Sequence, residues 1–169
     1  MKKQGFTLIE LMVVIVIMGI LAAVAVPKLF GMIAKSKASE IGPAAGEYVK
    51  LQDAFVSESG TNWGSWHMIG YTMNTSNNVF SYDSVTTTTS GTGVLGTAVA
   101  VWKATPKAAL NDCTTSNFWQ LKISKATGTG ANGAVYDAEV SGGAGGNCDV
   151  LVPGFGKLDQ NGVADAPSN

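Results

Sequence analysis

The chain has 169 residues, enough for one domain with a modest hydrophobic core. Its 11 basic residues are all lysines and face 12 acidic residues, so there is no basic stripe and nothing indicates contact with nucleic acid. A single histidine, His67, excludes a multi-histidine metal cluster within one chain. The first 27 residues hold most of the continuous apolar sequence, so the positive mean hydropathy describes one segment.

The N-terminal segment begins with Lys2 and Lys3 and continues into an apolar run from Phe6 to Pro27. Glu10 is the only charged residue in that run. A helix of this length spans about 33 Å at about 1.5 Å per residue, which is enough to cross the hydrocarbon core of a bilayer. The two lysines would hold its start on the cytoplasmic side.

Three interpretations of this segment compete. An ordinary signal peptide would be cleaved after Ala25, where Ala23-Val24-Ala25 forms a small-x-small site. The segment could instead be a plain transmembrane anchor or a prepilin N-terminus. Glu10 distinguishes the three interpretations, because inserting a carboxylate deep in a membrane helix costs about 2.5–3.5 kcal/mol on insertion scales. Only a subunit that must pair its helix with a neighbour gains from that charge.

The run from Gly5 to Leu11, GFTLIEL, resembles the cleavage and methylation motif of type IV pilins and their pseudopilin relatives. The resemblance covers about the first 30 residues. It implies a leader peptide of residues 1–5, removed by a prepilin peptidase that cuts between Gly5 and Phe6. It also implies N-methylation of Phe6 and a role in assembly for Glu10.

The physical chemistry of Glu10 supports that role. Cleavage creates a positively charged amine on Phe6, and methylation keeps the charge. In a filament core, the amine of one subunit would offset the buried carboxylate of the next, whereas a subunit out of register would leave both charges unpaired. We therefore hypothesise that Glu10 sets the register of assembly. The cleaved chain would carry 9 lysines against 12 acidic residues, a formal side-chain charge of −3.

The first helix segment, residues 6–27, contains two residues that destabilise a helix and so indicate where its helical structure can loosen. Gly19 lies in its middle and Pro27 ends the uncharged stretch. In a helix interior Gly costs about 1 kcal/mol and Pro about 3 kcal/mol relative to Ala. The resemblance implies that the helix can loosen between them in a fibre. The alternative is that Gly19 permits close packing and Pro27 makes a kink.

An amphipathic helix half is predicted for residues 28–59. Its apolar side chains recur every three or four residues, which indicates a surface packed on a globular domain. Pro43 should bend or interrupt the helix, and Ser59-Gly60 should end it. The stripe comprises Leu29, Ile33, Ile41, Ala45, Tyr48, Leu51, Gln52 and Phe55.

Residues 60–169 are predicted to form a β-rich globular domain with a C-terminal disulfide loop. We expect strands at residues 94–102, 118–125, 134–140 and 149–152, with the second and third forming a hairpin. Across that hairpin Lys122 should face Asp137 or Glu139. Residues 61–90 are predicted to be a long connection. The expected fold class is therefore α+β, a long helix packed on a small antiparallel sheet.

Cys113 and Cys148 are the only cysteines, and they suit one disulfide in an oxidising compartment. Two thiols in a cytosolic chain are the alternative. The string Gly128-x-Gly130-x-x-Gly133 fits a dinucleotide fingerprint, but it joins two predicted strands and opens no helix, so we interpret it as a hairpin loop. His67 is interpreted as a surface or half-buried structural residue. Core packing is favoured over carbohydrate contact for Trp63 and Trp66.

The C-terminal tail contains oxygen ligands at alternate positions before a turn glycine, as at the start of a calcium loop. The candidates are Asp159, Asn161 and Asp165, but the downstream glutamate of such a loop is missing. We favour a solvated acidic tail over a calcium site. No other cofactor or metal is expected.

The sequence thus predicts a structural subunit, not an enzyme, since no nucleophile, base and orienting group occur together. Its partners would be further copies of itself in a helical polymer, the prepilin peptidase, the assembly machinery and the inner membrane before assembly. The fibre would be extracellular and serve adhesion, motility or DNA uptake. The alternatives are a pseudopilin of a type II secretion system and a secreted adhesive or carbohydrate-binding module that starts near Val26.

Overall fold

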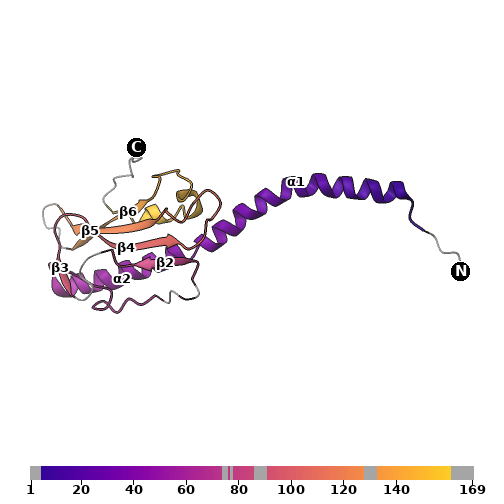
Figure 1. Ribbon diagram of the computed structural model, residues 1–169. Helices are drawn as coiled ribbons and strands as arrows, with labels where there is room; N and C mark the ends of the chain where they lie inside the picture. The colour runs from indigo at the N-terminus through magenta and orange to yellow at the C-terminus, as the bar shows by residue number, and fades with distance from the viewer. Residues whose placement is uncertain (1–4, 74–75, 77, 86–90, 128–132, 161–169) are drawn as a thin grey trace.

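The computed structural model describes residues 5–73, 76, 78–85, 91–127 and 133–160. It shows a long helix that projects from a compact α+β domain, so the predicted fold class is confirmed (Figure 1). The helical part consists of α1, Leu8–Ala38, and α2, Ile41–Ser59. Only the end of α1 and the whole of α2 lie against the domain (Figure 1).

Helix α1 continues without interruption through Gly19 and Pro27. The proline is accommodated inside the helix, where its ring and missing N–H cost a backbone hydrogen bond but do not end the element. The only buried residues of α1 are Ala34 and Ala38, near its end. Burial against the domain therefore begins at Ala34, and the prediction that Leu29 and Ile33 are part of the packed stripe was wrong, since both are exposed.

The helical segment is interrupted as predicted, but at Ser39 and Glu40 and not at Gly42-Pro43. Pro43 lies in the first turn of α2. Its ring would collide with the carbonyl group four residues earlier, which belongs to Ser39, so the break falls upstream of the proline. The predicted end is confirmed, since α2 stops at Ser59 and Gly60 caps it with φ 76°.

The apolar stripe of α2 packs on the domain as predicted. Ile41, Ala45, Tyr48 and Gln52 are buried, and Phe55 is half-buried. The buried amide of Gln52 meets the backbone of Gly64. With its oxygen accepting from the Gly64 N–H at 2.9 Å and its nitrogen donating to the Gly64 carbonyl at 3.1 Å, both polar groups are satisfied.

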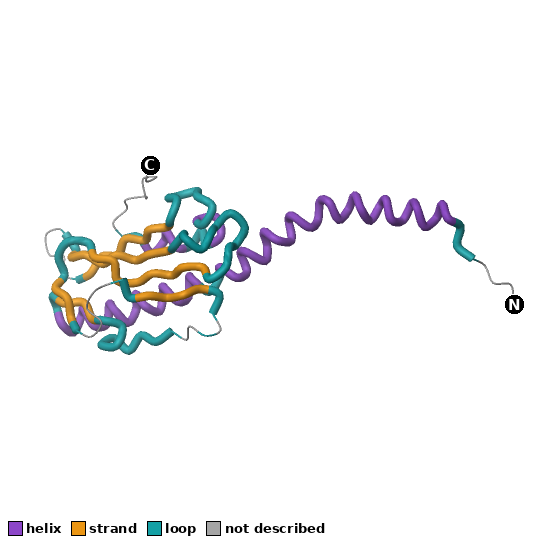
Figure 2. The backbone as a smooth tube through the Cα atoms, viewed as in Figure 1, coloured by secondary structure: helices purple, strands orange, loops and turns teal. Residues whose placement is uncertain are grey.

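The main sheet has four antiparallel strands in the order β2-β4-β5-β6 (Figure 2). They comprise Phe80–Asp83, Val99–Pro106, Trp119–Lys125 and Ala134–Val140. A second, two-stranded sheet pairs β1, Asn62–Gly64, with β3, Thr92–Val94. Short 3₁₀ helices, η1 and η2, follow β6 at Asp149–Leu151 and Phe155–Leu158.

The hairpin of β5 and β6 is confirmed in both register and alternation. Trp119, Leu121 and Ile123 are buried, whereas the residues between them are half-exposed. Lys122 lies opposite Asp137 in the register and forms an ion pair with Glu139 at 2.5 Å. Such an exposed pair contributes at most about 1 kcal/mol, so burial of the apolar face is what fixes the register.

Three strand predictions were wrong. The expected strand 94–102 is divided between the end of β3 and the start of β4, with a turn around Gly96 where the chain passes from one sheet to the other. The expected connection 61–90 contains β1 and β2. In place of the expected strand 149–152, Asp149–Leu151 form the 3₁₀ helix η1, and the Asp149 carboxylate accepts from the Gly145 N–H at 2.8 Å.

Candidate functional site

The candidate site is the start of α1, where Thr7 and Glu10 form a capping box. The Thr7 backbone N–H donates to Glu10 Oε2 at 2.8 Å, and the Thr7 hydroxyl donates to the same oxygen at 2.7 Å. The Glu10 N–H approaches the Thr7 hydroxyl at 3.4 Å. A capping box satisfies helix N–H groups that have no partner within the helix.

This cap explains how a lone carboxylate is oriented on an apolar helix. Both bonds use Oε2, so Oε1 of Glu10 is the oxygen that the described part of the chain leaves open for a further donor. A carboxylate accepts through both oxygens. The side chain can therefore remain bound to its own Thr7 and still accept a charged amine from outside.

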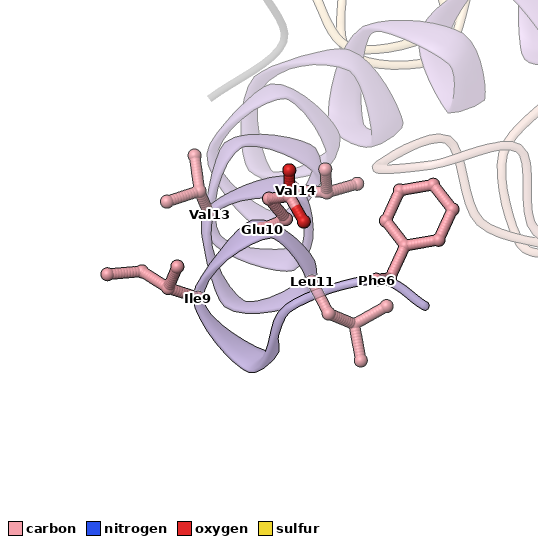
Figure 3. A pocket seen from close by; sticks show the side chains of 6 residues that line it. All are labelled: Phe6, Ile9, Glu10, Leu11, Val13 and Val14. Carbon is pink, nitrogen blue, oxygen red and sulfur yellow. The ribbon is translucent and has the colours of Figure 1, made fainter. Parts of the chain in front are cut away.

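The surroundings of Glu10 are apolar and uncovered. Figure 3 shows Phe6, Glu10 and four aliphatic side chains around an open hollow on the first turns of the helix. Phe6 is 90% exposed, and Leu8 is 83% exposed. From Leu8 to Ile33 every described side chain except that of Gly31 is exposed. A contiguous apolar surface of this length indicates burial in a bilayer or against other proteins.

Length and composition also allow α1 to cross a membrane. None of the most apolar window is covered by the chain itself, which distinguishes it from the core helix of a globular domain. Gly5, just before the helix, is exposed and has no neighbour within 4 Å of a Cβ placed on it. The predicted cleavage point thus lies on accessible, non-helical backbone.

Gly19 is likewise open, with nothing within 4 Å of a Cβ built on it. The single chain therefore offers no contact that requires a glycine there. Loosening of the helix between Gly19 and Pro27 stays a prediction, as do the roles of Gly5, Phe6 and Glu10 in processing and assembly.

The predicted disulfide is confirmed. Cys113 and Cys148 are joined, with 5.0 Å between their Cα atoms, and both are fully buried. The bond ties the turn of Leu110–Cys113, between β4 and β5, to the start of η1. It therefore joins two short segments that lie outside the named strands of the sheets.

The remaining sequence candidates lie apart from this site. His67 is exposed in a turn, and Trp63 is buried, as core packing predicts. Trp66 is half-buried and donates its indole N–H to the Val101 carbonyl at 3.0 Å. Carbohydrate contact by these two rings is therefore not supported.

The glycine string is described only at its last residue. Gly128 and Gly130 fall outside the described residues, and Gly133 precedes β6 with φ 130°. No helix follows it, so the context of a dinucleotide site is missing there. Of the calcium candidates, Asp159 is half-buried, whereas Asn161 and Asp165 fall outside the described residues. Calcium binding stays a prediction.

A polar network inside the domain was missed by sequence reasoning. Tyr71 donates to the Ala44 carbonyl at 3.0 Å and accepts from the Trp102 indole N–H at 2.9 Å, which links α2 to β4. Burial raises the pKa of Tyr71 to about 12. No local pattern reveals such a bridge, because its three members come from distant parts of the chain.

Glu40 forms a second such link at the break between the helices. Its Oε1 accepts from the Phe80 N–H at 3.2 Å and from the Tyr82 hydroxyl at 3.0 Å, both in β2. The capping box, in contrast, was visible in the sequence as Thr7-x-x-Glu10 before an apolar run.

The features described so far define a class: a chain with an exposed apolar helix near its N-terminus, one capped carboxylate at the start of that helix, and a disulfide-bonded α+β domain. Residues 1–26 match the family model described as the prokaryotic N-terminal methylation motif. The chain therefore carries the N-terminal region that type IV pilins share with type II secretion pseudopilins.

Three curated relatives illustrate the similarity. The type IV major pilin protein PilA of Myxococcus xanthus is 46% identical over 57 residues, 34% of this chain and 26% of its own. The fimbrial protein EcpC of Eikenella corrodens is 47% identical over 64 residues, 38% and 39% of the two chains. The type II secretion system core protein G of Escherichia coli K12 is 49% identical over 53 residues, which are 31% of this chain and 34% of that protein.

The chain thus spans between about a quarter and two fifths of the length of these relatives. No solved structure matches the chain. The similarity is therefore established for the N-terminal helical region, and the globular domain has to be interpreted from its own geometry.

Proposed function

We propose that this protein is a structural subunit of a type IV pilus. The observation that carries the proposal is the uncovered apolar surface of α1, which projects from the domain and bears one capped carboxylate near its start. Such a surface is stable in only two environments, a bilayer or a bundle of similar helices. A subunit that passes from membrane to fibre uses both.

In this proposal a prepilin peptidase cuts between Gly5 and Phe6 at the inner membrane, and the new N-terminal Phe6 is methylated. The amine of one copy then reaches Oε1 of Glu10 in the next, while Thr7 holds Oε2. The pair sets the register, since a misplaced copy would leave a buried cation and a buried anion unpaired. The fibre is extended outward by the assembly machinery and lies outside the cell.

Two variants separate the charge of Glu10 from its capping role. Glu10→Gln keeps an oxygen acceptor for Thr7 but removes the negative charge, whereas Thr7→Val keeps the charge but removes the hydroxyl. We expect Glu10→Gln to be inserted and cleaved normally yet to yield no fibre in electron micrographs of sheared cell surfaces. Thr7→Val should weaken the cap by about 1 kcal/mol and still assemble. Fibres of normal yield from Glu10→Gln would contradict the register hypothesis.

Mass analysis of the N-terminus tests the processing itself. N-methylated Phe6 as the first residue is expected, whereas a start near Val26 would indicate an ordinary signal peptide and a secreted module. The second candidate function is that of a pseudopilin, favoured by the similarity to core protein G. Loss of protein secretion without loss of surface fibres, on deletion of the chain, would favour that role.

A further inference from the structure

The charges of the cleaved chain are segregated along its length. Between Glu10 and Glu40 the only charged residues are Lys28, Lys35 and Lys37, which we call the basic stretch. From Glu40 to the C-terminus 11 acidic residues face six lysines, a formal side-chain charge of −5. A helix segment of charge +3 therefore connects the apolar run to an acidic domain.

The lysines of the basic stretch are exposed and lack ion-pair partners in the part of the chain that the structure describes. Lys28 and Lys35 share one side of α1, and Lys37 lies on another, at the edge of a hollow of about 100 Å³ between α1 and Asn111. Among the described residues, their charges therefore have no carboxylate partner.

Exposed apolar side chains accompany these lysines. Leu29, Met32 and Ile33 are 56%, 63% and 41% exposed, although they lie beyond the 22-residue run that would fill a bilayer. Leu29 and Met32 lie on the side of the helix opposite Ala34 and Ala38, its two buried residues, whereas Ile33 lies beside the hollow next to Asn111. The stretch therefore combines an uncovered apolar strip with lysines on both of its edges.

A matching surface exists on α2. Glu47 and Glu58 are eleven residues apart, about three turns, so they lie on one side of the helix, and both are exposed. Ala54 lies between them, exposed and small, which permits close approach of another helix. Lys50 is the only lysine of α2, so with Glu47 and Glu58 this exposed side of the helix carries net negative charge. Asp53 does not belong to it, because its carboxylate accepts from the Tyr136 hydroxyl of β6 at 2.8 Å.

We propose that the basic stretch of α1 in one copy binds the exposed acidic side of α2 in another copy. The inference rests on the proposed filament function and assigns it a second, polar subunit contact outside the apolar helix bundle. The two surfaces lie about 20 residues apart along the helices, so the copies would be displaced by about 30 Å along the axis. At an ionic strength near 0.15 M screening acts within about 8 Å, so the pairs must be in close contact to add attraction.

Zero-length carbodiimide cross-linking of sheared fibres tests this contact. We expect amide bonds from Lys28, Lys35 or Lys37 to Glu47 or Glu58, identified by mass spectrometry of the digested fibre. Lys35 and Glu58 of one copy lie about 35 Å apart along the helices, too far for a bond without a spacer, so this linkage must join two copies. The cleaved full-length chain as detergent-solubilised monomer should give none.

Charge reversal supplies an independent test. Lys35→Glu and Glu58→Lys should each lose most of the sheared fibre, and the double variant should regain it. Lys157→Glu, which makes the same change at an exposed position of η2, is the matched control and should assemble normally. Since all these side chains are exposed, the circular dichroism of each variant should be that of the wild type.

The outcomes separate the inference from the function it rests on. Wild-type fibres without these cross-links, or a double variant that does not recover, would overturn the contact while leaving the filament function intact. If the reversals release the chain from membranes and no cross-link forms, the lysines bind anionic lipid headgroups and the inference is wrong. Absence of fibres from the wild type would instead refute the proposed function.

Discussion

At the scale of single residues, Tyr71 shows how one hydroxyl can join two layers of the domain. It donates to the backbone of α2 at Ala44 and accepts from Trp102 in β4, and both neighbours are removed from water. The same burial that raises its pKa makes its hydrogen bonds difficult to replace, since a buried group without a partner loses its solvation.

Removal of this hydroxyl should therefore destabilise the domain more than its size suggests. Tyr71→Phe leaves the Trp102 indole N–H without an acceptor, and we expect the free energy of unfolding to fall by about 1–3 kcal/mol. Urea unfolding of the full chain in detergent, followed by tryptophan fluorescence, measures the change. Trp66→Phe, which removes one half-buried donor at the edge of the core, is the comparison and should cost less.

At the scale of elements, the disulfide compensates for weak local structure. The turn before β5 and the short helix η1 have few backbone hydrogen bonds, and the bond between Cys113 and Cys148 joins them across 35 residues. Loop-closure theory gives a stabilisation of about 4 kcal/mol for a loop of that length, as an upper figure.

The corresponding double variant should lower the stability of the domain without changing the membrane helix. For Cys113→Ser with Cys148→Ser we expect a loss of about 2–5 kcal/mol in the free energy of unfolding. Membrane insertion and cleavage after Gly5 should continue, because only the end of α1 lies near the disulfide and the apolar run before it is not covered by the domain. Unfolding curves of the wild type and the double variant, recorded under non-reducing conditions, measure this loss of stability. Coincident curves would contradict the expectation.

The helices illustrate a related point at the same scale. The start of α1 is set locally by Thr7 and Glu10, and the start of α2 by Pro43, which is why both could be expected from the sequence. The orientation of α2 on the sheet is set by Glu40, whose carboxylate binds β2 some 40 residues later. No pattern in the sequence near Glu40 predicts this contact, because its partners are some 40 residues away.

At the scale of the whole molecule, all four tyrosines of the chain are held by the domain core. Burial raises the pKa of Tyr48, Tyr82 and Tyr136 far above the ordinary value and that of Tyr71 to about 12. In Tyr136 and Tyr82 a neighbouring carboxylate adds to the effect, from Asp53 and Glu40 respectively.

Alkaline unfolding should follow from this arrangement. Each tyrosine keeps its proton in the folded state at a pH where the unfolded chain, with pKa values near 10, has lost it. The stability contributed by the four groups is therefore fully present below about pH 10 and is lost as the pH rises further. We expect tyrosinate absorbance and the loss of circular dichroism to appear together. A tyrosine that ionises near pH 10 while the fold is intact would contradict this.

The sequence by itself determined the features that depend on neighbours in the chain. The apolar run, the cleavage motif, the capped start and the bend near Pro43 are all local patterns. The hairpin of β5 and β6 was also predicted from the sequence, because apolar and polar side chains alternate along both strands and a Gly-rich stretch joins them.

Only the tertiary structure decided what depends on distant contacts. It placed β1 and β2 in a segment that was expected to be a connection, and it made residues 149–151 a 3₁₀ helix held by a disulfide and an aspartate. These segments are too short for periodicity to mark them, so their conformation is set by what they pack against. The basic stretch of α1 divides in the same way: its three lysines can be read from the sequence, but only the structure shows that they are exposed and form no ion pair among the described residues.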